Sequence, residues 1–103
     1  MGFFNALGKG LATLHNSAEE RIAKNICGGD PVRNAPDKVR EILRNMKNGQ
    51  RNDDEVYRQR VNALRVIMSY LARKAVDDRN AEMVRSLIVS KHGSELMKHG
   101  IEL

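Results

Sequence analysis

The fold is decided by residues 57–75, whose sequence is YRQRVNALRVIMSYLARKA. Apolar side chains recur there in alternating steps of four and three residues, at Tyr57, Val61, Leu64, Met68, Leu71 and Ala75. Side chains three and four positions apart lie on the same side of an α-helix, so this spacing indicates one helical face. The stretch therefore predicts a helix over 53–76, which begins with acids that suit the positive end of a helix dipole.

This helix is apolar over more than one narrow face. Ala63, Ile67 and Tyr70 widen the apolar face on one side, and Ala72 widens it on the other. At 100° per residue the apolar arc spans about 200°, which exceeds the contact face of a two-stranded coiled coil. A helix of this kind must touch at least two others. We therefore predict an all-α fold, a compact bundle of four to five helices around the 53–76 helix.

The other helices are predicted from their start and stop signals. One covers 3–27, with a candidate break near 15–17, and ends at Gly28-Gly29. A second covers 35–48, because Pro36 suits a first helical turn. Asp77-Asp78 offers a cap for a helix over 79–92, and a short helix follows over 94–99. We predict that these helices form a single domain over 1–103.

The tripeptide Lys-His-Gly occurs twice, at 91–93 and at 98–100. On one continuous helix, His92 and His99 would share a side with Glu95 and Glu102, which is a pattern that can bind Zn²⁺ or Ni²⁺. The glycines favour another interpretation, in which each copy ends a helix with cations at its negative end and glycine as the cap. We therefore predict two helix ends here, no metal site and no cofactor.

The net charge of +5 is concentrated in one segment. Residues 31–52 contain six Lys or Arg residues against two acids, a net charge of +4. The predicted partner-binding residues are Arg33, Arg40, Arg44, Lys47 and Arg51. Such a cationic row can be a solvated helix face whose long side chains cover apolar neighbours. It can also bind an acidic protein surface or, as the alternative, nucleic acid without reading its sequence. A helix-turn-helix reader of DNA is disfavoured, because the following helix begins with Asp53, Asp54 and Glu55, which phosphates repel.

The N-terminal segment is amphipathic and nearly uncharged. Its apolar side is formed by Phe3, Phe4, Leu7, Leu11 and Leu14. We predict that these residues contact the core or a second copy of the chain, with attachment to a membrane surface as the alternative. Only four residues of the chain are aromatic, so a partner chain would supply apolar contact that the small core lacks, and we expect a homo-oligomer. Arg60 projects into the apolar arc of the 53–76 helix, where it reaches water or pairs with a carboxylate of another helix or subunit.

The remaining features bound the function class. The single cysteine, Cys27, excludes an intramolecular disulfide and fits a reducing compartment. No apolar run approaches the length of a membrane span, so we expect a cytoplasmic protein. No arrangement of nucleophile, base and acid indicates catalysis. We therefore predict a small non-enzymatic interaction or regulatory protein, of the adaptor or inhibitor type.

Overall fold

The computed structural model describes residues 18–47 and 54–103, and within these ranges the chain is helical without any strand. Residues 18–27 are helical and are followed by α2 (Pro31–Lys47), α3 (Asp54–Lys74) and α4 (Arg79–Lys98). The prediction of an all-α fold is confirmed, and four helices fall within the predicted four to five. The single domain over 1–103 stays a prediction, because residues 1–17 and 48–53 lie outside the described ranges.

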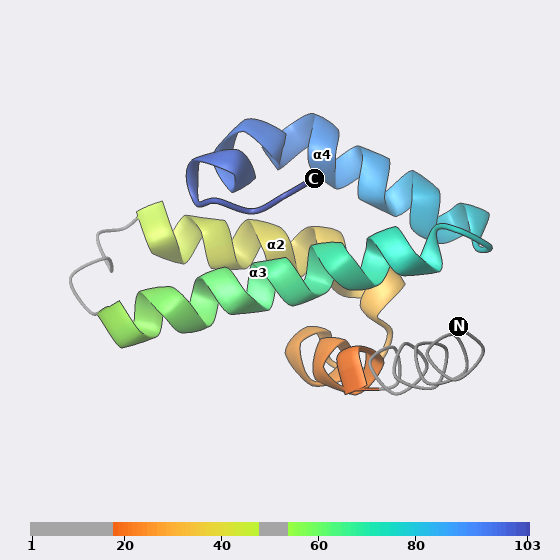
Figure 1. Ribbon diagram of the computed structural model, residues 1–103, viewed down its shortest axis with the longest axis horizontal. Coiled ribbons are helices and arrows are strands. Elements are labelled where there is room, and N and C mark those ends of the chain that lie inside the picture. Colours follow the sequence, from red (N-terminus) through yellow and green to blue (C-terminus); the bar gives the residue numbers. More distant parts are fainter. Residues whose placement is uncertain (1–17, 48–53) are drawn as a thin grey trace, which may run out of the picture.

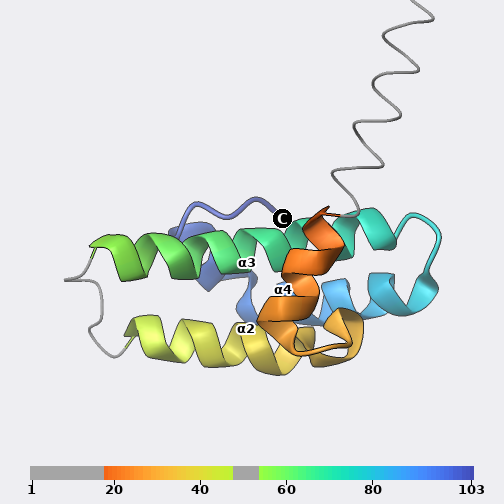
Figure 2. The same ribbon diagram turned by 90° about the horizontal axis from the view of Figure 1, so that it is seen from below.

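The helices pack in three layers. α2 and α3 lie side by side in opposite directions, and α4 covers one side of this pair, antiparallel to α3 (Figure 1). The helix over 18–27 crosses the opposite side of the pair (Figure 2). Each of α2, α3 and α4 contacts the other two. The central place predicted for the 53–76 helix therefore stays a prediction, since the contacts single out none of the three.

The core follows the predicted ladder of α3. Val61, Leu64, Met68 and Leu71 are buried, whereas Tyr57 and Ala75 at its two ends are half-buried. The apolar face widens on one side as predicted, because Ile67 and Tyr70 are also buried and Ala63 is half-buried. The predicted widening at Ala72 is wrong, because this residue is exposed. The largest fully buried side chains outside α3 are Val39, Ile88 and Leu96, so α2 and α4 complete the core.

The predicted stop at Gly28-Gly29 is confirmed. The backbone N–H groups of both glycines donate to the Lys24 carbonyl, at 2.8 and 3.0 Å. Their φ angles of +75° and +114° lie in the region that only glycine adopts without strain. The first helix therefore ends here and the chain turns toward α2.

The predicted start of the next helix at residue 35 is wrong, because α2 begins at Pro31. A carboxylate oxygen of Asp30 accepts from the Arg33 backbone N–H at 3.3 Å, and the Asp30 carbonyl accepts from that of Asn34 at 2.9 Å. Asp30 is thus the N-cap and Pro31 the first helical residue, a position where a missing N–H costs nothing. Pro36 lies inside the helix instead, where it leaves the Val32 carbonyl without the usual backbone donor.

α4 is one continuous helix, so the predicted separation into 79–92 and 94–99 is wrong. It begins as predicted at Asp78, whose side chain accepts from the N–H groups of Asn80 and Ala81 at 2.9 and 3.3 Å. Gly93 is buried within it, and a Cβ atom there would lie only 3.3 Å from Cδ1 of Leu103. Gly93 therefore allows the C-terminal residues to approach the helix and does not end it.

The second glycine of the repeat does end a helix. Gly100 has a φ of +78°, and its N–H donates to the Met97 carbonyl at 2.9 Å. The N–H of Ile101 donates to the Leu96 carbonyl at 3.1 Å, and both of these side chains are buried. This pattern of hydrogen bonds is a Schellman motif, and burial of apolar side chains at these two positions is usual for it. The predicted helix end is therefore confirmed at Gly100, though not at Gly93.

Candidate protein-interaction site

The exposed face of α2 carries the predicted binding residues. Arg33, Arg40 and Arg44 are all exposed, and their spacings of seven and four residues place them on one side of the helix. We call these three arginines the α2 row. The Lys47 side chain and Arg51 lie outside the described part of the structure. The structure thus aligns three of the five predicted cations, and their role in binding stays a prediction.

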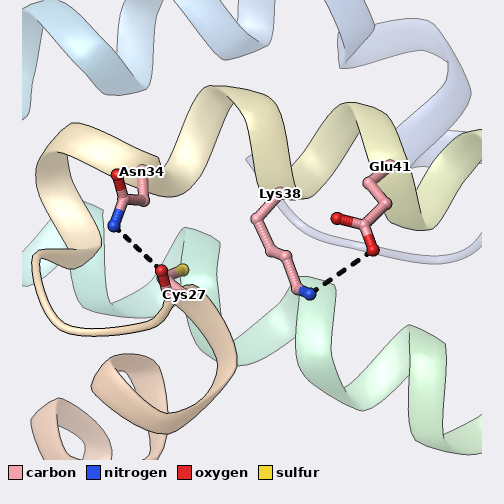
Figure 3. Close-up of polar contacts among 4 residues, drawn as sticks. All are labelled: Cys27, Asn34, Lys38 and Glu41. Atoms are coloured by element: carbon pink, nitrogen blue, oxygen red, sulfur yellow. Dashed lines mark hydrogen bonds and ion pairs between the residues drawn. The ribbon is translucent and has the colours of Figure 1, made fainter.

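The α2 row is only weakly neutralised by its own helix. Arg40 pairs with Asp37 at 3.3 Å, and Lys38 pairs with Glu41 at 3.6 Å, the second pair being drawn in Figure 3. Exposed pairs of this kind contribute roughly 0–1 kcal/mol, so a partner can replace them at little cost. Arg44 forms no ion pair with any residue that the structure describes. The α2 row therefore remains cationic.

A groove between α2 and α4 extends the cationic row across the surface. It contains two adjoining hollows of about 140 and 180 Å³ that share Arg40 and His92. The first is lined in addition by Pro36, Asp37, Leu87, Ile88 and Lys91, and the second by Leu43, Arg44 and Glu95. Their apolar parts come from the edge of the core, and their rims are mostly cationic. We refer to these residues together as the α2/α4 groove.

Sequence reasoning missed the contribution of α4 to this groove. Lys91 and His92 were expected at a helix end, whereas the continuous helix places them beside Arg40. Gly93 lies buried inside this helix, where an added Cβ atom would meet Leu103, ten positions away in the sequence. Glu95 also lies in the groove and is engaged in a contact of its own.

The surroundings of Cys27 indicate a structural role for this residue. Its carbonyl accepts a hydrogen bond of 2.9 Å from the Asn34 side-chain amide, which ties the end of the first helix to α2 (Figure 3). Burial raises the pKa of the Cys27 thiol, and the nearby Lys38 opposes this only in part. A buried thiol with a raised pKa is a poor nucleophile. Cys27 thus belongs to the packing between these helices.

A second polar anchor holds the first helix against α3. The Ser69 hydroxyl donates to Oε2 of Glu19 at 2.9 Å, and Nε of Arg73 lies 3.5 Å from Oε1 of the same carboxylate. These residues are about fifty positions apart in the sequence, and no local pattern predicts such a contact. The anchor orients the helix over 18–27 on the side away from the α2/α4 groove.

The two histidines of the repeat lie in different environments. His92 lines the α2/α4 groove, whereas Nδ1 of His99 is hydrogen-bonded to the Tyr57 hydroxyl at 2.9 Å. No group of three or more His, Cys, Asp or Glu residues that could hold a metal ion occurs in the described ranges. The candidate set of His92, His99, Glu95 and Glu102 therefore does not form such a group.

Of the residues predicted to contact a second copy of the chain or a membrane, the structure describes only Arg60. Its side chain is half-buried, and its Nη1 atom is buried without a hydrogen-bond partner among the residues described here. Phe3, Phe4, Leu7, Leu11 and Leu14 lie outside those residues. Among the helices that the structure describes, none is both long and apolar enough to cross a bilayer.

No protein-family model matches the chain, and none of the characterised proteins or solved structures compared with it does so either. Function is therefore inferred from the α2 row and the α2/α4 groove.

Proposed function

We propose that this protein is a non-enzymatic interaction protein that binds an acidic surface of a partner protein through the α2 row. The observation that carries the proposal is the alignment of Arg33, Arg40 and Arg44 on one exposed face, next to Lys91 and His92 of α4. Separate cations on two helices define a surface that is wider than one helix face. Such a surface matches discrete carboxylates on a partner and selects acidic partners by electrostatic complementarity.

Nucleic acid is the alternative ligand for the same cations. Asp37 and Glu95 place carboxylates within the α2/α4 groove, where a continuous run of phosphates would meet them. A protein partner can leave its acidic side chains out of these positions, so the groove favours protein over nucleic acid. A gel-shift titration with duplex DNA and RNA tests this choice, because phosphate binding weakens steeply with added salt.

The direct test is affinity capture with charge-reversed variants. We expect the partner that wild type retains to be lost by the Arg40→Glu/Arg44→Glu variant, and we expect high salt to weaken the complex. The matched control is Arg21→Glu/Arg65→Glu, which makes the same change of charge at exposed positions on other helices. A partner retained equally by wild type and by the α2 variant would overturn the proposal.

The expected self-association and membrane attachment are tested separately. Sedimentation equilibrium of the full chain measures the oligomeric state, and the Arg60→Leu variant tests whether Arg60 pairs across a subunit contact. Co-sedimentation with lipid vesicles, with and without residues 1–16, tests the membrane alternative for Phe3, Phe4, Leu7, Leu11 and Leu14. Binding to vesicles that depends on residues 1–16 would favour that alternative over the protein partner.

A further inference from the structure

α4 is apolar on two opposite sides. Its inner side buries Ala81, Ile88 and Leu96 in the core. Its outer side presents Met83, Leu87 and Met97 to solvent, with exposed fractions of 64%, 44% and 64%. A helix that only covers a core has one apolar face, with polar residues opposite it. The outer side of α4 therefore has more apolar surface than its place in the bundle requires.

The exposed apolar residues of α4 belong to an ordered pattern. Steps of four and three residues connect Met83, Leu87, Ser90, Ser94 and Met97, all of which are exposed and uncharged. We call these five residues the outer seam. This spacing gives one straight face of about 21 Å, at 1.5 Å per residue. The other large apolar side chains exposed in the described ranges, Ile22, Val76 and Leu103, lie singly on other parts of the chain.

The charges beside the outer seam indicate what could cover it. Leu87 belongs to both the seam and the α2/α4 groove, so the seam borders Arg40 and Lys91 directly. Arg79 and Lys98 are exposed on α4 itself, near the two ends of the seam. Three acids lie on this surface. Glu82 is on α4, Asp37 is paired with Arg40, and Glu95 has a contact of its own.

The balance of charge therefore favours an acidic occupant over a second copy of the chain. Around the seam and the groove the cations are Arg40, Arg44, Arg79, Lys91 and Lys98, which outnumber the three acids. A second copy docked on the same surface would bring its own excess of cations against this one. An acidic segment would meet opposite charge instead.

We propose that the outer seam of α4 docks an amphipathic helix of an acidic partner. Apolar side chains of that helix pack on Met83, Leu87 and Met97, and the small Ser90 and Ser94 leave room for its backbone. Carboxylates on its flank face Lys91 and the arginines of α2. Recognition of this type anchors a helix at positions that repeat every three and four residues. Methionine suits such a surface because its flexible side chain adapts to different partners.

This inference rests on the proposed function, because the acidic partner is the same one. It adds an apolar anchor that the α2 row does not supply, and it assigns a helical form to the partner segment. Electrostatic contact steers association, whereas buried apolar anchors at the centre of an interface supply most of its affinity.

The test uses the full chain with a synthetic peptide as the probe. The peptide is about 15–18 residues long, with leucines in steps of four and three and glutamates at most other positions, so that it spans the seam as a helix. The readout is NMR of ¹³C-labelled methionine methyl groups. We expect the signals of Met83 and Met97 to shift on titration, and those of the buried Met46 and Met68 to stay in place. A peptide with lysine in place of glutamate should cause no shift.

Two variants test whether the peptide binds at the outer seam. Met83→Ser/Leu87→Ser should weaken binding of the acidic peptide at least about tenfold, because two apolar anchors are lost. Val76→Ser removes a side chain that is 87% exposed outside the seam, and it should leave binding unchanged. Unmoved Met83 and Met97 signals, or equal binding by both variants, would overturn the proposal.

The same titration separates this inference from the proposed function. Binding that is lost in Arg40→Glu/Arg44→Glu but kept in Met83→Ser/Leu87→Ser would support the α2 row and overturn the seam. The reverse result would support the seam and overturn the α2 row. Signals of Met83 and Met97 that shift with protein concentration alone would show a second copy on the seam, and that result also overturns the acidic helix.

Discussion

Two identical tripeptides, Lys91-His92-Gly93 and Lys98-His99-Gly100, lie seven residues apart and have different roles in the fold. In the first, glycine lies inside α4 and makes room for Leu103, while His92 faces the α2/α4 groove. In the second, glycine ends the helix with a positive φ angle, and His99 bonds to Tyr57 of α3. The same three residues are thus part of a candidate binding surface in one place and of a helix cap in the other.

The two copies differ because the next residues in the chain are different. After Gly100 the chain presents Ile101, whose side chain is buried in the core and whose N–H closes the Schellman motif. After Gly93 the chain presents Ser94 and Glu95, and neither supplies the apolar contact that such a motif needs. In this chain, the Lys-His-Gly copy that ends a helix is the one followed by a buried apolar residue.

The largest effect is expected when that apolar contact is removed. Ile101→Ala deletes a side chain that is 2% exposed, and such changes cost about 2–5 kcal/mol of unfolding free energy. Urea denaturation monitored by circular dichroism measures the loss. Leu103→Ala is the control, since Leu103 is 39% exposed and should cost well under half as much. Equal losses in the two variants would show that Ile101 does not fix the end of α4.

Replacing each of the two glycines by alanine should change the unfolding free energy by a smaller amount, with a loss at Gly100 and no loss at Gly93. Gly100→Ala places a side chain at a φ of +78°, which costs about 1–2 kcal/mol. Gly93→Ala gains up to about 1 kcal/mol of helix propensity, because its position is helical. The new methyl group would meet Cδ1 of Leu103 at 3.3 Å, but this atom is the end of a partly exposed side chain that can shift. We expect Gly93→Ala to be neutral or stabilising by the same urea measurement.

The control for the glycine comparison is a double variant. Leu103→Ala removes the atom that the new methyl group would meet, so Gly93→Ala should stabilise more in that background than in wild type. A Gly93→Ala variant that loses as much stability as Gly100→Ala would contradict the roles assigned to the two copies.

The sequence predicts this fold wherever the deciding contacts are local. The α3 ladder, the stop at Gly28-Gly29 and the cap at Asp78 all depend on residues within a few positions of one another. The predicted start of α2 was too late, because both Pro31 and Pro36 suit a first helical turn. Only Pro31 also follows a capping residue, Asp30. Each of these features could be read from short stretches of sequence.

The candidate site depends on contacts that are distant in the sequence. The α2 row was predictable, because helical spacing alone aligns Arg33, Arg40 and Arg44. The groove beside it needs α4 to pack against α2, which brings together residues about fifty positions apart, such as Arg40 and Lys91. Likewise, nothing near Glu19 indicates that it will bond to Ser69. The sequence therefore predicts the cations of α2 and a helix over 79–92, but not that this helix packs beside them.

The smallest expected effect concerns the two histidines. Tyr57→Phe removes the hydrogen bond to His99 and keeps the ring contact, in which the ring centroids lie 5.7 Å apart. We expect a loss of about 0.5–1.5 kcal/mol in unfolding free energy, the usual net value of one hydrogen bond. His92→Gln should change stability by no more than about 0.5 kcal/mol, since it alters a residue on the rim of a groove.

The two variants should rank in the opposite order when binding of the acidic peptide is measured in place of stability. His92→Gln changes a residue shared by both hollows of the α2/α4 groove, so it should weaken peptide binding, whereas Tyr57→Phe should leave binding unchanged. Fluorescence anisotropy with a labelled peptide measures both variants under the same conditions. If Tyr57→Phe weakened binding and His92→Gln did not, the second copy of the repeat, and not the first, would belong to the binding surface.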